Sequence, residues 1–128
     1  MLNEAKLIDM GCKKILVVDD EVDICYLISS VLKKVGEVNI ETASSLQSAS
    51  AKVVQFRPSL VFLDNHLGDG MGVDYIPVLK QTCEDCKVIM VSAYDTSIDR
   101  MKAIKNGADA FISKPFTKEA IINVLSSL

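Results

Sequence analysis

Short apolar runs recur along the chain roughly every 20 to 25 residues, and segments with helical spacing lie between them. The runs Ile15–Val18 and Leu60–Leu63 contain no polar position, which is typical of a strand that is buried on both faces. Val38, Ile40 and Thr42 alternate with polar residues and indicate a further strand. The predicted strands are residues 15–18, 38–42, 60–63, 88–91 and 110–112.

Each predicted strand is followed by a segment whose apolar residues recur at helical spacing. Ser44 with Gln47 forms a capping-box pattern, and Thr96 with Asp99 can cap in the same way. Thr117 opens the last helix, in which Leu128 is expected to point inward. Besides a third helix that begins near residue 74, the predicted helices are residues 24–35, 46–56, 98–106 and 118–128.

The third helix is the hardest to delimit because it contains Pro77. Proline does not fit a helix interior, so we expect this helix to begin near Asp74, with Pro77 in its first turn. The preceding residues, Gly68–Gly72, are expected to form a flexible loop. Strict alternation of strands and helices predicts an α/β fold with an open, doubly wound parallel sheet and helices on both faces.

Composition narrows the classes of function. The 128 residues suffice for one domain, and the net charge of −3 with scattered Lys and Arg argues against nucleic-acid binding by this chain alone. No apolar run is long enough to span a membrane, and the N-terminal residues do not resemble a secretory signal, so we expect a cytoplasmic protein. Cys83 and Cys86 form a lone CxxC, which we interpret as ordinary reduced thiols.

Polar residues whose side chains can bind metals or take part in reactions stand at the ends of four predicted strands. Because the carboxyl ends of parallel strands meet at one edge of the sheet, these side chains are expected to gather there. Asp20 could instead simply cap the first helix, and Lys114 could be an ordinary solvated lysine. These two alternatives do not explain why polar residues recur at the ends of four strands. The residues are Asp19, Asp20, Asp64, Ser92 and Lys114.

Three neighbouring carboxylates repel one another, and Mg²⁺ with oxygen ligands would relieve that repulsion. Asp64 is a credible nucleophile, since carboxylates can form aspartyl phosphates. Phosphoryl transfer mainly requires that the phosphate oxygens be positioned and neutralised. The metal, Lys114 and the hydroxyl of Ser92 could each serve one of these oxygens.

Four motifs, KKILVVDDE, LVFLDNHLGDG, VIMVSA and FISKPF, resemble in order and spacing the receiver domains of two-component response regulators. The resemblance implies a CheY-like, flavodoxin-like fold with a five-stranded sheet in the order 2-1-3-4-5. It also implies a receiver domain over residues 14–128, preceded by an N-terminal extension over residues 1–13.

The resemblance implies a role for each residue of the site. Asp64 would be the phosphoacceptor, Ser92 the switch hydroxyl, and Lys114 the phosphate contact. A cis peptide bond is implied between Lys114 and Pro115. The implied Mg²⁺ ligands are Asp19, Asp20, Asp64 and the backbone carbonyl of His66.

A receiver would accept its phosphoryl group from a histidine kinase or a phosphotransfer protein and catalyse only its own phosphorylation and dephosphorylation. The fourth helix, fifth strand and fifth helix would then repack to control a partner, an effector domain or a phosphorylation-dependent homodimer. Phe111 stands where many receivers carry a tyrosine that moves inward on activation. His66 and Tyr94 are expected to flank the path of water to the phosphoryl group and to set the lifetime of the phosphorylated state.

Two other functions stay open at the level of sequence. A phosphohydrolase could use the same aspartyl phosphate, although its best-known form carries a second acid where His66 stands. A scaffold that is independent of phosphate would keep only the fold, and the complete set of site residues argues against it. Sustained turnover of a phosphate ester would indicate the former, and binding indifferent to Asp64→Ala the latter.

Overall fold

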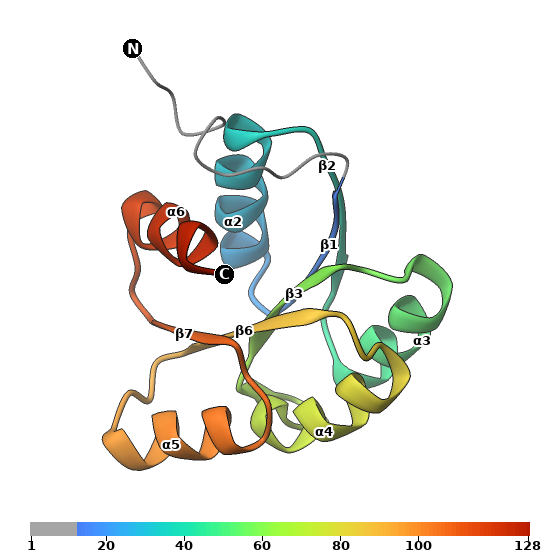
Figure 1. The fold of residues 1–128 in the computed structure, drawn as a ribbon, viewed down its shortest axis with the longest axis vertical. Coiled ribbons are helices and arrows are strands. Elements are labelled where there is room, and N and C mark those ends of the chain that lie inside the picture. The colour runs from blue at the N-terminus through green and yellow to red at the C-terminus, as the bar shows by residue number, and fades with distance from the viewer. Residues whose placement is uncertain (1–12) are drawn as a thin grey trace.

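The computed structural model describes residues 13–128, so residues 1–12 of the predicted N-terminal extension lie outside the described part. Five parallel strands form one sheet in the order β2-β1-β3-β6-β7. This order confirms the predicted doubly wound sheet (Figure 1). The strands are β1 (Lys13–Val18), β2 (Val38–Ala43), β3 (Leu60–Asp64), β6 (Lys87–Ser92) and β7 (Ala110–Ser113).

Within residues 13–128, five helices cover the two faces of the sheet (Figure 1). Helices α2 and α6 pack together on one face, whereas α3, α4 and α5 lie on the other. Alternate residues of β1 supply the two cores, since Ile15 and Val17 belong to one cluster and Leu16 and Val18 to the other. The helices are α2 (Val22–Val35), α3 (Leu46–Phe56), α4 (Gly72–Thr82), α5 (Ser97–Lys105) and α6 (Lys118–Ser127).

Two of the three helix caps predicted from the sequence are confirmed. Thr96 and Asp99 form a reciprocal capping box at α5, and the Thr117 hydroxyl accepts the Ala120 N–H at α6. The capping box predicted for Ser44 and Gln47 is wrong, because the N-cap lies one residue later. Ser45 is the N-cap of α3, and its Oγ atom accepts the N–H of Ser48.

Helix α4 begins earlier than predicted, at Gly72, which places Pro77 in the second turn rather than the first. A proline at this position deprives the carbonyl four residues earlier, on Val73, of its helical hydrogen bond. The Nδ2 atom of Asn106 donates to that oxygen over 2.8 Å. The side chain of Asn106 therefore compensates for the proline, which the sequence pattern did not reveal.

Two further expectations are corrected. The segment expected as a flexible loop contains a short antiparallel ribbon, in which β4 (His66–Leu67) pairs with β5 (Gly70–Met71). Leu128 follows the last turn of α6 as its C-cap, so its side chain is 44% exposed instead of pointing inward.

Within residues 13–128, no helix combines the length and apolar character needed to cross a membrane. Cys25, Cys83 and Cys86 are free thiols, and Cys12 lies outside the described residues. Burial, together with the nearby Cys83, raises the pKa of Cys86 to about 12, so this thiol is not activated as a nucleophile.

Candidate phosphorylation site

The carboxylates of Asp19, Asp20 and Asp64 gather at one edge of the sheet. One oxygen from each lies within 4.8 Å of the others. The parallel pairing of β1 with β3 causes this, because the chain runs directly from Val18 to Asp19 while β3 ends in Asp64. Asp19 and Asp64 are buried, and Asp20 is exposed at the rim.

Lys114 joins the acidic group from the end of β7. Its Nζ atom lies 3.0 Å from Oδ2 of Asp19 and 3.2 Å from Oδ1 of Asp64. The peptide bond to Pro115 is cis, as predicted, and the backbone N–H of Lys114 donates to the carbonyl of Ser92 over 2.8 Å. Burial alone would lower the pKa of Lys114, but its hydrogen bond to Asp19 and the two carboxylate charges raise the pKa overall.

The electrostatics leave the site with an excess of negative charge. Burial is the main cause of the raised pKa of Asp64, and the charge of Asp19 adds to it. Lys114 lowers the pKa of Asp64 without cancelling these effects. Three carboxylates therefore face one ammonium group. Clustered oxygen ligands with residual negative charge suit a hard divalent cation, so the acidic cluster can hold a metal.

Ser92 ends the neighbouring strand β6 and is 1% exposed. Val91 pairs with Asp64 in the sheet, so Ser92 stands one residue further along the same edge. Its Oγ atom accepts the backbone N–H of Tyr94 over 3.1 Å. The hydroxyl is thus linked directly to the loop that leads into α5.

The rings of His66 and Tyr94 lie together beside the site. Their centroids are 4.4 Å apart, with an angle of 45° between the ring planes. Both residues are exposed, and each stands two positions beyond a residue of the site, Asp64 or Ser92. The pair is available to solvent at the surface rather than packed in the core.

Phe111 is half-buried on β7, beneath the guanidinium group of Arg100. The Cζ atom of Arg100 lies 4.6 Å from the ring centroid. Arg100 also pairs with Asp95 and donates to Oγ of Ser113 over 3.0 Å, while Ser113 donates to Asp95. This network joins α5, β7 and the loop that follows Ser92.

Two supporting residues escaped the sequence-based selection. The backbone carbonyl of Asn65 accepts the N–H of Gly72 over 2.7 Å, and its Oδ1 accepts the N–H of Val73 over 3.0 Å. A Cβ atom on Gly72 would lie only 2.1 Å from the backbone oxygen of Asp64. Gly72, the last glycine of the GDGMG segment, was a signal in the sequence for a close backbone approach. The role of Asn65 has no such signal, because it depends on the fold.

The chain is similar to known proteins over most of its length. Residues 15–126 match the family model of the response regulator receiver domain. The nitrogen assimilation regulatory protein NtrX of Azorhizobium caulinodans is 34% identical over 110 residues, covering 84% of this chain and 24% of that protein. The phosphate regulon transcriptional regulatory protein PhoB of Klebsiella pneumoniae is 33% identical over 112 residues, covering 86% of this chain and 48% of PhoB.

Among solved structures, the receiver domain of NtrX from Brucella abortus is similar, with a TM-score of 0.80 and 36% identity. That match covers 88% of this chain and 95% of the other. The chain spans about half or less of the length of the two curated relatives. On the family match over most of its length, the chain belongs to the response regulator receiver domain family.

Proposed function

We propose that this chain is a magnesium-dependent phosphorylation switch in which Asp64 accepts the phosphoryl group. The observation that carries the proposal is the position of the Asp64 carboxylate, which lies within 4.8 Å of oxygens of Asp19 and Asp20 and 3.2 Å from the ammonium of Lys114. The carboxylate is buried, yet it stands at the edge of the sheet where ligands bind in folds of this kind. A phosphoryl group bonded to Asp64 would lie beside the positively charged ammonium group of Lys114.

Mg²⁺ would be held by Asp19, Asp20, Asp64 and the backbone carbonyl of His66, and it would supply positive charge to the phosphate oxygens. Lys114 can neutralise another phosphate oxygen once it leaves its present contact with Asp64. The hydroxyl of Ser92 can donate a hydrogen bond to a third.

The donor would be a phosphohistidine of a histidine kinase or a phosphotransfer protein. The phosphorus–nitrogen bond breaks as the phosphorus–oxygen bond to Asp64 forms, and the histidine leaves and takes up a proton. Water later attacks the phosphorus, releases inorganic phosphate and restores the carboxylate. The chain would catalyse only these two reactions of its own side chain, and we propose that it does so in the cytoplasm.

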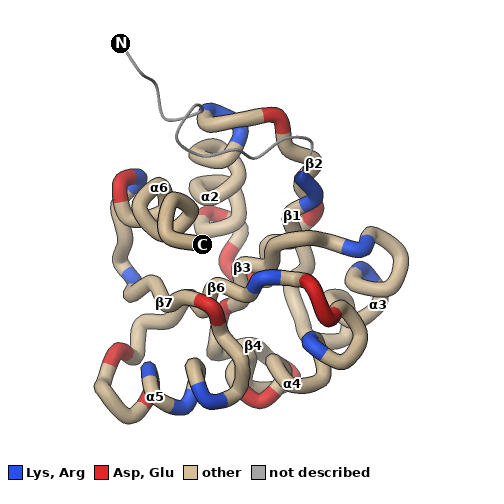
Figure 2. The backbone as a smooth tube through the Cα atoms, in the orientation of Figure 1, with Lys and Arg blue, Asp and Glu red and all other residues tan. Residues whose placement is uncertain are grey.

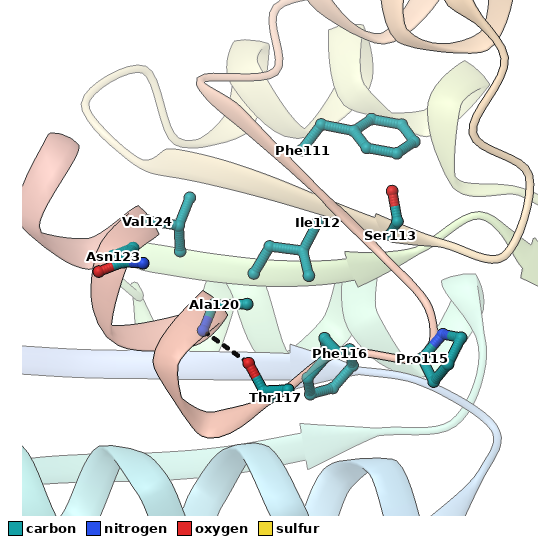
Figure 3. Close-up of a pocket in the computed structure, with 9 residues that line it drawn as sticks. All are labelled: Phe111, Ile112, Ser113, Pro115, Phe116, Thr117, Ala120, Asn123 and Val124. Carbon is teal, nitrogen blue, oxygen red and sulfur yellow. Dashed lines mark hydrogen bonds between the residues drawn. The ribbon is translucent and has the colours of Figure 1, made fainter.

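The output surface would be the face formed by α5, β7 and α6. Movement of the Ser92 hydroxyl would pull the loop at Tyr94, and Asp95 in this loop would transmit the movement to Arg100 and Phe111. A cavity of about 480 Å³ lies on this face between β7 and α6. Figure 3 shows Phe111 and Ser113 on one side of the strand and Ile112 on the other, toward α6.

The recipient of the signal would be an output protein, an effector domain or a second copy of the chain. Ile98 and Met101 on α5 are 78% and 70% exposed, which suits an apolar contact. Figure 2 shows that Lys and Arg within residues 13–128 are spread over several elements with Asp and Glu among them, which disfavours nucleic-acid binding by this part of the chain.

Intact-protein mass tests the proposal. The chain is incubated with a small acyl phosphate, with and without Mg²⁺, and compared with Asp64→Ala. We expect one added phosphoryl group that requires both Mg²⁺ and Asp64. Release of many phosphates per chain would indicate a phosphohydrolase instead, and the absence of both adduct and phosphate release would indicate a scaffold.

A further inference from the structure

The tip of the β4–β5 ribbon is bonded to the first turn of α3 by one carboxylate. Oδ1 of Asp69 accepts the N–H of Leu46 over 2.9 Å, and Oδ2 accepts the N–H of Gln47 over 3.0 Å. The partners are 23 and 22 residues apart in the chain, so this is a tertiary contact rather than a local cap. Ser45 accepts only the third N–H of the turn, that of Ser48.

Electrostatics favour this contact. A helix N-terminus carries partial positive charge and free N–H groups, and a carboxylate satisfies both requirements. The backbone hydrogen bonds from Leu46 and Gln47 lower the pKa of Asp69, so the side chain is an anion at neutral pH. The ribbon also lies against this turn, since a Cβ atom on Gly70 would be 3.0 Å from Cδ1 of Leu46.

The ribbon is therefore fixed at its base and at its tip. At the base, Asn65 accepts the N–H groups of Gly72 and Val73. At the tip, Asp69 is bonded to α3. His66, whose carbonyl is a proposed metal ligand, begins the ribbon between these two attachments.

The start of α3, to which Asp69 is bonded, also lies close to the acidic pair Asp19 and Asp20. The backbone N–H of Asp19 donates to the carbonyl of Ala43 over 3.0 Å, just before the turn that opens α3. Asp19, Asp20, Ser44 and Ser48 line one depression of about 220 Å³. Asp69 thus bonds the segment that carries Asp64 and His66 to the helix end whose Ser48 lines the same depression as Asp19 and Asp20.

We propose that Asp69 is a positioning residue for the metal site: it holds the ribbon that follows Asp64 in register with the acidic pair. This inference rests on the proposed function, because it concerns the metal that would serve phosphorylation. Asp69 touches neither the cluster nor a phosphoryl group, and it acts through the backbone of the ribbon. Residues that orient metal ligands in this way commonly change metal affinity when they are replaced.

The test is calorimetric titration of the full chain with Mg²⁺ in the absence of a phosphodonor. Asp69→Ala is expected to weaken Mg²⁺ binding by about tenfold. Asp69→Asn keeps one acceptor oxygen and is expected to fall between the native chain and Asp69→Ala. Ser45→Ala is the matched control, because it removes a hydrogen bond from the same helix end without releasing the ribbon.

Phosphorylation by a small acyl phosphate gives a second readout. Asp69→Ala is expected to raise the Mg²⁺ concentration for half-maximal rate while leaving the rate at saturating Mg²⁺ close to that of the native chain. Urea unfolding without Mg²⁺ shows whether a variant is folded, and Asp69→Asn replaces Asp69→Ala in both assays if the latter does not fold.

Native affinity in both Asp69 variants, or an equal loss in Ser45→Ala, would overturn the role of Asp69. If the native chain itself bound no Mg²⁺ and accepted no phosphoryl group, the proposed function would fail together with this inference. The behaviour of the native chain therefore separates the two failures.

Discussion

The Nζ atom of Lys114 lies 3.2 Å from Oδ1 of Asp64, although the two residues are 50 positions apart in the chain. The contact closes a triangle with Asp19, whose Oδ2 atom lies 3.0 Å from the same nitrogen. The side chain of Lys114 is 13% exposed, and those of Asp19 and Asp64 are 2% and 6% exposed. The lysine therefore counterbalances two carboxylates that the fold has largely removed from water.

Lys114→Ala should destabilise the metal-free protein by about 3 kcal/mol, because it leaves buried carboxylates without their partner. Added Mg²⁺ should restore more stability to this variant than to the native chain, since a cation at the cluster replaces the missing charge. Urea unfolding with and without Mg²⁺ measures both effects. Lys87→Ala removes an exposed pair at 3.9 Å and should change little in either condition. Equal stabilisation of all three chains by Mg²⁺ would contradict this prediction.

Asp64→Asn should stabilise the metal-free protein near neutral pH by about 0.5–2 kcal/mol, because it removes a carboxylate charge that burial and Asp19 disfavour. Because the pKa of Asp64 is raised in the folded state, ionising this group disfavours folding as the pH rises through that pKa. The difference between variant and native chain should therefore shrink as the pH falls toward the ordinary value of 3.8. Urea unfolding at a series of pH values tests this, with the exposed Asp85→Asn as the control. A pH-independent difference would refute the electrostatic explanation.

The sequence alone located the ends of β1 and β3, because in each an apolar run is followed by an aspartate. Asp19 and Asp64 could be placed at one edge once the sheet was known to be parallel. The start of α4 could not be placed, because it depends on the side chain of Asn65 accepting an N–H and on Asn106 satisfying the carbonyl beside Pro77. Such tertiary hydrogen bonds leave no periodic signal in the sequence.

The same limit applies to the support of the site. Nothing in the spacing indicates that Asp69 caps a helix that begins 23 residues earlier. The network around Phe111 was equally hidden, since Arg100 reaches Phe111 and Ser113 only when α5 packs beside β7. The gathering of Asp19, Asp64 and Lys114 at one edge of the sheet was therefore predictable, whereas the hydrogen bonds of Asp69 and Arg100 were not.

Gly72→Ala should destabilise the protein by about 3 kcal/mol or more, because the new methyl group would collide with the backbone oxygen of Asp64 at 2.1 Å. Gly68→Ala is the matched control, since no atom lies within 4 Å of its Cβ position. The control should change stability by less than about 1 kcal/mol. Thermal unfolding of both variants measures this, and similar melting temperatures would show that the close approach has been misjudged.

Asp109→Asn should cost about 1 kcal/mol near neutral pH. Burial tends to raise the pKa of Asp109, but hydrogen bonds from Lys80 and from the N–H of Val88 lower it overall. A lowered folded pKa means that the carboxylate stabilises the fold above its unfolded pKa and loses this contribution as the pH falls through the folded pKa. The variant and native chain should thus converge in acid. Urea unfolding at neutral and acid pH measures how the difference in stability changes with pH. A difference that grows in acid would contradict the prediction.

His66→Ala and Tyr94→Ala should each shorten the life of the phosphorylated state, because the paired rings would shield the approach of water to the phosphoryl group. We expect dephosphorylation to be about threefold to tenfold faster, equal to roughly 1 kcal/mol in the barrier. Phosphate release from the phosphorylated chain measures the rate. Tyr26→Ala serves as the control, since this exposed tyrosine lies on α2 and outside the ring pair. Unchanged rates in both variants would remove the two rings from this role.

Mapping the phosphorylated residue tests the central claim most directly. After incubation with an acyl phosphate and Mg²⁺, borohydride reduces an aspartyl phosphate to homoserine, and peptide masses locate the changed residue. We predict that position 64 alone is converted, and that omission of Mg²⁺ abolishes the conversion. A stable modification at another residue, or at position 64 without any requirement for Mg²⁺, would contradict the proposed metal-dependent switch.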